Sequence, residues 1–432
     1  MKQTIMILAL CTMAASVRAD YKETMDSNGL TQNLQADYGF VDDNAGSDQS
    51  AKLQQAIDQV AEQGGGRLIL PKGVYSFSGI NLKSGVHLLI EKDTVIKPWW
   101  PDGSKIAVFA MDGSSGTEAG YVENVSIRGL GGKFIVDYSE RGARKGEGSR
   151  VVNCRGVKNF QISDVYVKDS FTTYCAFVFT PVKDKATRGK GVYGPTDGLV
   201  KNLKNTDSSA GYGLVQMHGG DTIHFENLEA YGGGVTFRLE TGSGGEHGGI
   251  HHITAKNIYC ENGMSAMVMG PHSAQNGVVK VDGVTAKSCM YAAMMGPGYV
   301  ETKYQGNDKF KPGIFGKGST VENVHAIFGT DAAISLKEIV YVPKKYHKDL
   351  RIDKNDPKQK RIRGASIGAV RDATEGSWNP IIKNVTSEGF EYNKGVMKTS
   401  KKDRVNWKQV LKGLPIADEL EQALKKVPKK KK

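Results

Sequence analysis

Met269-Gly270-Pro271 recurs as Met295-Gly296-Pro297, 26 residues farther along the chain, and this is the sharpest of several internal repeats. Shorter repeats surround it, each with an apolar residue, a polar residue, then Asn, Asp or Gly, then a second apolar residue. They are Val122-Glu123-Asn124-Val125, Val157-Lys158-Asn159-Phe160, Phe225-Glu226-Asn227-Leu228, Ala255-Lys256-Asn257-Ile258, Val281-Asp282-Gly283-Val284, Val321-Glu322-Asn323-Val324 and Ile382-Lys383-Asn384-Val385. A period in the twenties is typical of a solenoid, whose coils bury their apolar faces by stacking. The sequence therefore predicts an all-β fold, a right-handed parallel β-helix.

The residues ahead of the repeats predict how the coil closes at its N-terminal end. Residues 36–41 have the pattern of a short strand, and Asp48 stands as an N-cap before a helix over residues 51–63. The apolar side chains at helical spacing are Leu53, Ala56, Ile57 and Val60. Glycines at 64–66 end this helix. Such a helix would cover strand edges and apolar core that an open coil exposes.

The C-terminal part departs from the repeat. Residues 344–363 are dense in Lys and Arg and are predicted to form an insertion or long loop. Residues 406–427 have the pattern of a helix that caps the C-terminal end, and lysines at 429–432 form a tail. We therefore expect one β-helix domain over residues 20–405, followed by a C-terminal helix and Lys tail over residues 406–432.

The first residues have the features of a secretory signal. Lys2 precedes a largely apolar run over residues 4–15, and Val17 and Ala19 are small residues at the −3 and −1 positions of a cleavage site. This run is too short to span a membrane, and no later stretch approaches ~20 apolar residues. We expect removal of residues 1–19 and a secreted product with no membrane partner.

Charge narrows the class of partner. The net charge is +12, which suits an anionic partner such as nucleic acid, lipid or an acidic glycan. No nucleic-acid-binding motif is present, and no basic amphipathic helix precedes the C-terminal end. For an exported protein we therefore predict a sulfated or carboxylated polysaccharide as partner, bound partly by the basic insertion, and no nucleic acid.

Cysteines and metal ligands give weaker signals. After the signal, Cys154, Cys175, Cys260 and Cys289 remain, too few in so long a chain for a disulfide scaffold, and we expect them to be buried core residues. No cluster has the ligand spacing of a zinc site. Loop carboxylates are suitable ligands for a structural calcium ion, but the sequence singles out no position for one.

Strand alternation sorts the central residues, because neighbouring side chains on a strand point to opposite faces. In residues 234–241 the expected core set is Val235, Phe237 and Leu239, and the expected outer set is Thr236, Arg238 and Glu240. In residues 214–218 the core set is Val215 and Met217, and the outer set is Gln216 and His218. Gln216 and Glu240 are 24 residues apart, about one coil, and His272 follows Glu240 by 32 residues. We therefore expect these three residues to share one outward strip with Arg238.

Two features of this strip suggest chemistry. A carboxylic acid beside an arginine can protonate a glycosidic oxygen while an anionic sugar is held, so Arg238 and Glu240 form a candidate pair. The alternative is a surface ion pair that contributes ~0–1 kcal/mol to stability. Glu246 and His247 lie in a glycine-flanked loop, from which they either reach a substrate or remain solvated.

Three segments resemble a known family. Residues 233–241, residues 248–260 and residues 268–272 are similar in order and spacing to the catalytic region of the iota-carrageenases, glycoside hydrolase family 82. The similarity extends over residues 212–289, whereas residues 38–74 resemble β-helix carbohydrate enzymes in general. The resemblance implies an inverting endo-hydrolase that cleaves β-1,4 linkages in sulfated red-algal galactans.

The resemblance also implies roles for single residues. Glu240 matches the general acid, Gln216 matches the glutamine that helps place the catalytic water with an anion, and His272 matches the active-site histidine. We expect Arg238, His218 and His247 to bind substrate. These roles are assigned to this chain only through its resemblance to the family.

One position departs from the family pattern. The family carries its general base, an Asp, two residues after the acid, and this chain has Gly242 there. Residues i and i+2 on a strand lie ~6.6 Å apart on one face, and an inverting pair of carboxylates needs ~6.5–9.5 Å. Another group must therefore supply the base, with Glu246 as first choice and His272 as second.

Together these observations predict a monomeric, secreted endo-hydrolase of a sulfated galactan, with iota-carrageenan as the expected substrate. No cofactor is required by such chemistry, and a structural calcium or a bound chloride remains open. Two alternatives stay beside it: a β-eliminating polysaccharide lyase acting on a uronic acid glycan, and a non-catalytic glycan-binding β-helix.

Overall fold

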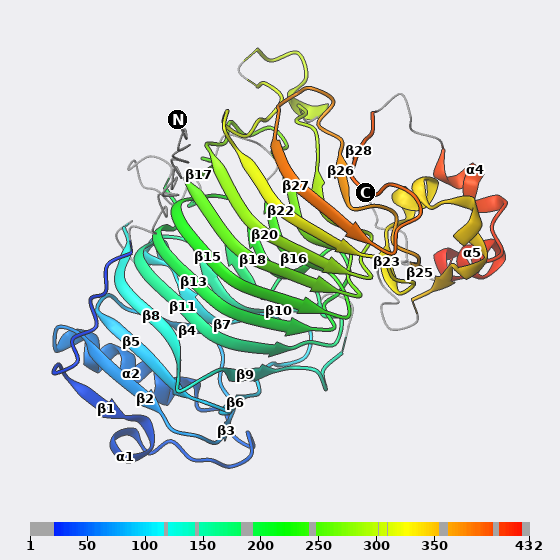
Figure 1. Cartoon of the computed structure of the whole chain (residues 1–432). Helices are drawn as coiled ribbons and strands as arrows, with labels where there is room; N and C mark the ends of the chain where they lie inside the picture. The colour runs from blue at the N-terminus through cyan, green and yellow to red at the C-terminus, as the bar shows by residue number, and fades with distance from the viewer. Residues whose placement is uncertain are drawn as a thin grey trace, which may run out of the picture.

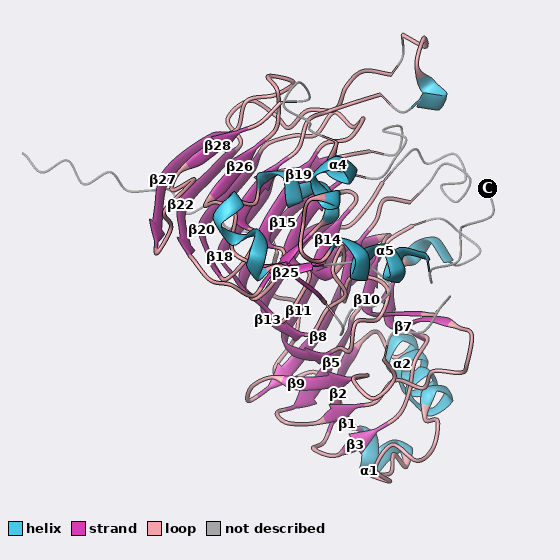
Figure 2. Cartoon of the chain, turned by 90° about the vertical axis from the view of Figure 1, so that its right-hand side faces the viewer, coloured by secondary structure: helices cyan, strands magenta, loops and turns pink. Residues whose placement is uncertain are grey.

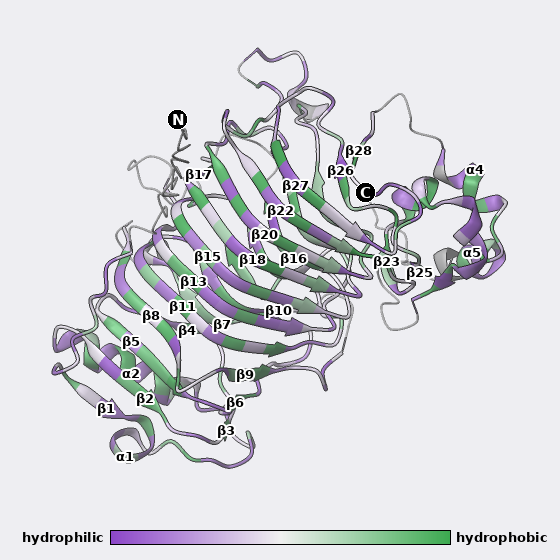
Figure 3. Cartoon of the chain, viewed as in Figure 1, coloured by the Kyte–Doolittle hydropathy of each residue, from purple (hydrophilic) through white to green (hydrophobic). Residues whose placement is uncertain are grey.

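The computed structural model describes residues 21–115, 120–142, 147–182, 193–241, 248–300, 302–308, 310–353, 362–400 and 406–425. Parallel strands stack coil upon coil around one apolar core, and the predicted parallel β-helix is confirmed (Figure 1). Along the strands in Figure 3, apolar and polar residues alternate, as a strand with one face in the core requires.

Two long sheets form the coil. Sheet 1 has, in spatial order, β1 (Thr31–Asn33), β2 (Gly66–Leu70), β5 (Val86–Glu91), β8 (Val122–Leu130), β11 (Val157–Lys168), β13 (Thr196–Thr206), β15 (Gly220–Tyr231), β18 (Ile253–Glu261), β20 (Val279–Lys287), β22 (Thr320–Ile327) and β27 (Ile381–Glu388). Short strands β3 (Val74–Tyr75), β6 (Val95–Ile96), β9 (Phe134–Asp137) and β17 (Ile250–His251) pair beside it. Sheet 2 has β4 (Ile80–Asn81), β7 (Lys105–Met111), β10 (Gly148–Cys154), β12 (Phe177–Phe179), β14 (Gly213–Met217), β16 (Val235–Glu240), β19 (Ser265–Gly270), β21 (Tyr291–Met295), β26 (Val370–Asp372) and β28 (Val396–Lys398).

The repeated asparagines lie at bends inside the long strands of sheet 1. Asn227 and Asn257 have φ of 55° and 57°, a left-handed conformation that Asn tolerates better than most residues. Their side chains form a ladder, because Asn257 Nδ2 donates to Asn227 Oδ1 and Asn227 Nδ2 donates to Asn202 Oδ1, each over 2.9 Å. The repeat is therefore a bend within a continuous strand and not a turn between two strands.

The N-terminal end is closed by helices. The strand predicted over residues 36–41 is wrong: α1 (Leu34–Tyr38) forms there, because the Asn33 side chain accepts the N–H groups of Gln35 and Ala36. Helix α2 (Ser50–Glu62) has Gln49 at its N-cap, one residue past the predicted Asp48. The four predicted apolar residues of α2 are buried in the main core, so α2 covers the first coils.

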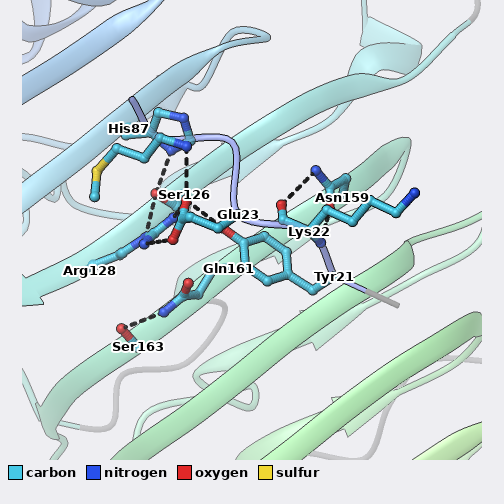
Figure 4. Close-up of polar contacts among 10 residues, drawn as sticks. Tyr21, Lys22, Glu23, His87, Ser126, Arg128, Asn159, Gln161 and Ser163 are labelled. Carbon is cyan, nitrogen blue, oxygen red and sulfur yellow. Dashed lines mark hydrogen bonds and ion pairs between the residues drawn. The ribbon is translucent and has the colours of Figure 1, made fainter. Parts of the chain in front are cut away.

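The first described residues lie across the outer face of sheet 1 (Figure 4). Arg128 donates from Nη1 and Nη2 to the Glu23 carboxylate, over 2.6 and 2.9 Å. Its Nε donates to Ser126 Oγ over 2.9 Å, and that hydroxyl lies 2.9 Å from His87 Nδ1. The bond from Arg128 lowers the pKa of Glu23 to about 2, and burial lowers the pKa of His87 to about 4. At neutral pH His87 is therefore uncharged, and its Nδ1 shares a hydrogen bond with the Ser126 hydroxyl.

The C-terminal part packs on one side of the coil (Figures 1 and 2). Strands β23 (Ala332–Ile334), β24 (Arg351–Ile352) and β25 (Ile362–Gly364) make a small antiparallel sheet. The predicted single C-terminal helix is two helices, α4 (Trp407–Lys412) and α5 (Ala417–Lys425), because Gly413 and Pro415 interrupt it. A second apolar core joins these elements to sheet 2 through Met290, Tyr291, Ile334, Ile362, Leu411 and Leu420.

The basic insertion contains an arginine with a structural role. Arg363 is buried, and its Nε donates to Asp353 over 2.8 Å. Its two terminal nitrogens donate to the backbone carbonyls of Gly232, Asn262 and Asp331. Arg363 therefore ties the insertion to the coil. The charge pattern had suggested that the basic insertion binds sulfate, but Arg363 is not free to do so.

Among the described residues, the cysteines are free and buried, as predicted; they are Cys154, Cys175, Cys260 and Cys289. Within the described ranges, no helix is long and apolar enough to cross a membrane.

Candidate active site

The strip predicted around Glu240 lies on the outer face of sheet 2. Phe237 and Leu239 are fully buried in the core, whereas Arg238 and Glu240 face outward with 14% and 20% of their side chains exposed. The prediction for Thr236 is wrong. It is fully buried, and its hydroxyl donates to the Tyr259 carbonyl over 2.7 Å.

The register of sheet 2 decides which outward residues are neighbours. Gln216 pairs with Arg238 and not, as the 24-residue spacing suggested, with Glu240. Glu240 pairs on the next coil with Gly270. Gln216 and His218 are half-buried on the preceding strand segment, so Gln216 lies diagonally to the Glu240 carboxylate.

Arg238 holds the Glu240 side chain. Its Nη2 forms an ion pair with Glu240 Oε2, and its Nη1 donates to the Gly211 carbonyl. The nearby carboxylate raises the pKa of Arg238 against the opposing effect of burial. Because both side chains are largely buried, this pair differs from the solvent-exposed ion pair considered as the alternative.

Two histidines flank the end of β16. His218 Nδ1 lies 3.0 Å from the Glu240 carbonyl, and His272 Nδ1 lies 2.7 Å from the Thr241 carbonyl. A carbonyl oxygen only accepts, so each Nδ1 carries the proton and each Nε2 presents a lone pair when the ring is neutral. Burial lowers the pKa of His218, which favours its neutral form. The His272 ring also contacts the Tyr299 ring, with centroids 5.3 Å apart.

Gly270 leaves space between the acid and the histidine. The position that a Cβ would occupy on Gly270 lies 3.2 Å from Glu240 Cγ and 3.5 Å from both Glu240 Oε1 and His272 Nε2. Those two polar atoms are therefore no farther apart than twice 3.5 Å. Gly296, on the next coil, differs from Gly270. Of the described residues, only backbone atoms lie within 4 Å of the position that a Cβ would occupy on Gly296.

A second group beside the strip was missed by the sequence reasoning. Cys175 Sγ lies 3.6 Å from Gln216 Oε1, and burial raises the pKa of this thiol to about 11. Arg150, on β10, stacks on the Tyr174 ring at 4.0 Å. Nothing in the sequence places β10 beside this region, because the connections between β10, β12 and β14 differ in length.

Three candidate residues cannot be placed. Gly242, Glu246 and His247 lie outside the described residues. Among the residues that the structure describes, no group of three or more His, Cys, Asp or Glu is arranged to hold a metal ion.

Comparison with known proteins gives this geometry a context. No family model matches the chain. An iota-carrageenase of Alteromonas macleodii is 33% identical over 306 residues, which cover 68% of this chain and 60% of the relative. An iota-carrageenase of Zobellia galactanivorans is 39% identical over 299 residues, covering 67% of this chain and 58% of the relative. This chain is a relative of the iota-carrageenases. It matches about 60% of the length of these curated iota-carrageenases.

Solved iota-carrageenase structures share the fold. One, described as complexed to iota-carrageenan fragments, has a TM-score of 0.79 at 26% identity and covers 90% of this chain and 95% of its own. Another, an iota-carrageenase of family GH82 from A. fortis, has a TM-score of 0.78 at 27% identity and covers 88% and 92%. The resemblance inferred from residues 212–289 is thereby confirmed and extends over most of the β-helix.

Proposed function

We propose that this protein is a secreted, inverting endo-hydrolase of a sulfated galactan, with iota-carrageenan as substrate. The observation that carries the proposal is the position of Glu240. It is a carboxylate on the outer face of the β-helix, held by Arg238 and bordered by Gly270, where a sugar can approach it. The curated relatives named iota-carrageenase support the substrate class.

In this proposal Glu240 acts as the general acid and protonates the leaving glycosidic oxygen. Arg238 keeps the carboxylate turned toward Gly270 before substrate binds. As the substrate binds, a sulfate competes for the guanidinium, so Arg238 links substrate binding to the position of the acid. Gln216, paired with Arg238, offers an amide that can orient the attacking water.

The general base is either His272 or Glu246. His272 has the right tautomer, because its Nδ1–H is engaged by the Thr241 carbonyl and its Nε2 is left to accept a proton from water. The His272 Nε2 atom lies at most about 7 Å from Glu240 Oε1. This upper bound admits only the lower end of the ~6.5–9.5 Å separation found in inverting enzymes. Glu246 remains the alternative, on the basis of its place in the glycine-flanked loop that follows Glu240.

Incubation with a panel of polymers tests the function. The panel contains iota-, kappa- and lambda-carrageenan, agarose, pectate and alginate, and reducing ends and ultraviolet absorbance are measured together. We expect new reducing ends from iota-carrageenan without new absorbance. Absorbance from pectate or alginate would instead indicate a lyase, because elimination creates a double bond. Binding to carrageenan without any cleavage would indicate a glycan-binding protein.

A further inference from the structure

The asparagine ladder of sheet 1 is interrupted at Gly283. Asn227 and Asn257 form consecutive rungs on β15 and β18. On β20 the register places Gly283 beside Asn257, and Gly283 adopts the same left-handed bend with φ of 77°. Because Gly283 has no side chain, Asn257 Oδ1 has no hydrogen-bond donor among the described residues. One rung of the ladder is therefore missing, and an acceptor is left open beside the gap.

The missing rung lies in a groove on the outer face of sheet 1. The groove has a volume of about 400 Å³ and runs across β15, β18 and β20, which lie side by side (Figure 1). A Cβ on Gly283 would lie 3.2 Å from Asn257 Oδ1, so a side chain at this position would enter the groove. The strip around Glu240 lies on sheet 2 and contributes nothing to it. The polar and aromatic lining residues are Glu229, Tyr231, Asn257, Tyr259 and Thr285.

Two tyrosines of the groove are held in place by carboxylates. The rings of Tyr231 and Tyr259 have centroids 5.5 Å apart. The Tyr231 hydroxyl donates to Glu229 Oε2 over 3.1 Å, and the Tyr259 hydroxyl donates to Glu261 Oε2 over 2.7 Å. Glu261 is fixed in turn by Lys287, whose Nζ lies 2.9 Å from its carboxylate. Because the rings are already ordered, a ligand that packs on them pays little additional conformational entropy.

Lys204 adds a positive charge at the edge of the groove. Its Nζ lies 4.8 Å from the centroid of the Tyr231 ring and 5.1 Å from that of the Tyr166 ring. It makes no ion pair with a carboxylate in the part of the chain that the structure describes, although Glu229 is its register partner on β15. The groove thus combines aromatic faces, an open amide oxygen at Asn257 and an ammonium group without a counter-charge.

We propose that this groove is a second glycan-binding site, in which a galactose ring of the sulfated galactan packs on Tyr259 and donates a hydroxyl to Asn257 Oδ1. A sulfate on the same chain is then placed near Lys204. The ligand matches the groove because a sugar ring carries apolar C–H faces and hydroxyl groups at its edge. This site rests on the proposed function for the identity of the glycan, but it lies outside the catalytic strip. Since a long chain can occupy both sites, the groove raises affinity for the polymer.

Gly283→Asn tests the site by restoring the missing rung. Asn already adopts this bend at positions 227 and 257, so the variant should fold with a melting temperature at least equal to that of the parent. The matched control is Gly131→Asn, the same substitution at φ of 79° where nothing lies within 4 Å of the Cβ position. Tyr259→Ala removes the ring instead and tests the site independently of the ladder.

Binding is measured in a Glu240→Gln background, so that glycans are bound without being cut. Calorimetry with a short iota-carrageenan oligosaccharide counts the sites. The parent and Gly131→Asn should bind two oligosaccharides per chain, whereas Gly283→Asn and Tyr259→Ala should bind one. The Kd for the polymer should rise by about tenfold in Gly283→Asn, because the second contact and its avidity are lost. With Glu240 intact, Gly283→Asn should cleave the short oligosaccharide at the parental kcat and show a raised KM only on the polymer.

Three outcomes would overturn the site. They are a parent that binds a single oligosaccharide per chain, a Gly283→Asn variant that still binds two, or an equal loss of binding in Gly131→Asn. If Gly283→Asn fails to fold, two oligosaccharides bound by Tyr259→Ala overturn the site by themselves. A parent that binds no carrageenan oligosaccharide removes the proposed function together with the groove. A parent that binds one, and cleaves it when Glu240 is intact, removes the groove alone.

Discussion

His272 donates its Nδ1–H to the Thr241 carbonyl over 2.7 Å, and this bond turns Nε2 toward the space beside Gly270 and Glu240. The backbone of the strand that carries the acid thus orients the imidazole of the next coil. The arrangement keeps a proton-accepting nitrogen on the face where the acid lies, although Gly242 cannot supply the carboxylate that the family carries there.

The first prediction concerns the base. If His272 is the base, His272→Ala should lose most turnover while Glu246→Ala stays within a few-fold of the parent. If Glu246 is the base, Glu246→Ala should lose turnover, and Gly242→Asp in that background should restore part of it. The acid limb of the pH–rate profile is an independent measure, because an imidazole ordinarily titrates near pH 6.5 and a carboxylate near 4. Full activity in both single variants would reject both assignments.

The second prediction concerns the acid. Glu240→Gln should keep polymer affinity and lose hydrolysis by roughly 10²–10⁴-fold, the usual contribution of a general acid. Initial rates of reducing-end release measure the loss. Glu322→Gln, which removes a carboxylate from β22 on sheet 1, is the matched control and should keep parental activity. A Glu240→Gln variant within a few-fold of the parent would remove Glu240 from the mechanism.

The third prediction uses the glycine beside the acid. Gly270→Ala places a methyl group 3.2 Å from Glu240 Cγ and 3.5 Å from His272 Nε2, so one or both side chains must move. We expect a loss of kcat of at least about tenfold, because small displacements of reacting groups are costly. Gly296→Ala is the control, since its nearest contact is a backbone oxygen at 3.7 Å. Equal kcat values for the two variants would show that the space at Gly270 is not needed.

The fourth prediction concerns acid stability. The pKa of His87 is lowered to about 4 in the folded protein, so the unfolded chain takes up a proton first as pH falls. Its contribution is complete above pH 6.5 and is lost as pH falls toward about 4, by up to ~1.4 kcal/mol per pH unit. Denaturant unfolding between pH 7.5 and 4 should therefore show a shallower loss in His87→Gln than in the parent.

The exposed His252, at the bend between β17 and β18, provides the control for this effect. His252→Gln should change the pH dependence of unfolding far less than His87→Gln, because 71% of that side chain is exposed and an exposed ion pair, here with Asp221, contributes little to stability. The Glu23 contribution belongs to a separate window. Its pKa is lowered to about 2, so its stabilisation is complete above 4.5 and is lost as pH falls through about 2. Parallel curves for parent and His87→Gln would contradict the role assigned to His87.

Local pattern alone determined the fold class and much of the core. The repeats predicted a β-helix, and the alternation in residues 234–241 placed Phe237 and Leu239 inside and Arg238 and Glu240 outside. These predictions succeed because strand periodicity and the stacking of coils act on neighbouring residues. Thr236 shows where alternation stops being sufficient: alternation places it on the outer face, but it is fully buried and hydrogen-bonded to the Tyr259 carbonyl.

Only the tertiary structure decided the neighbours. Register pairs Gln216 with Arg238 and Glu240 with Gly270, a result that depends on connection lengths and hydrogen bonding between coils. Arg150 reaches the same face from a coil whose spacing in the sequence shows no relation to Glu240. The sequence determines which residues can face outward, but the stacking of coils determines which of them meet, because contacts across a β-helix join residues that chain order does not place together.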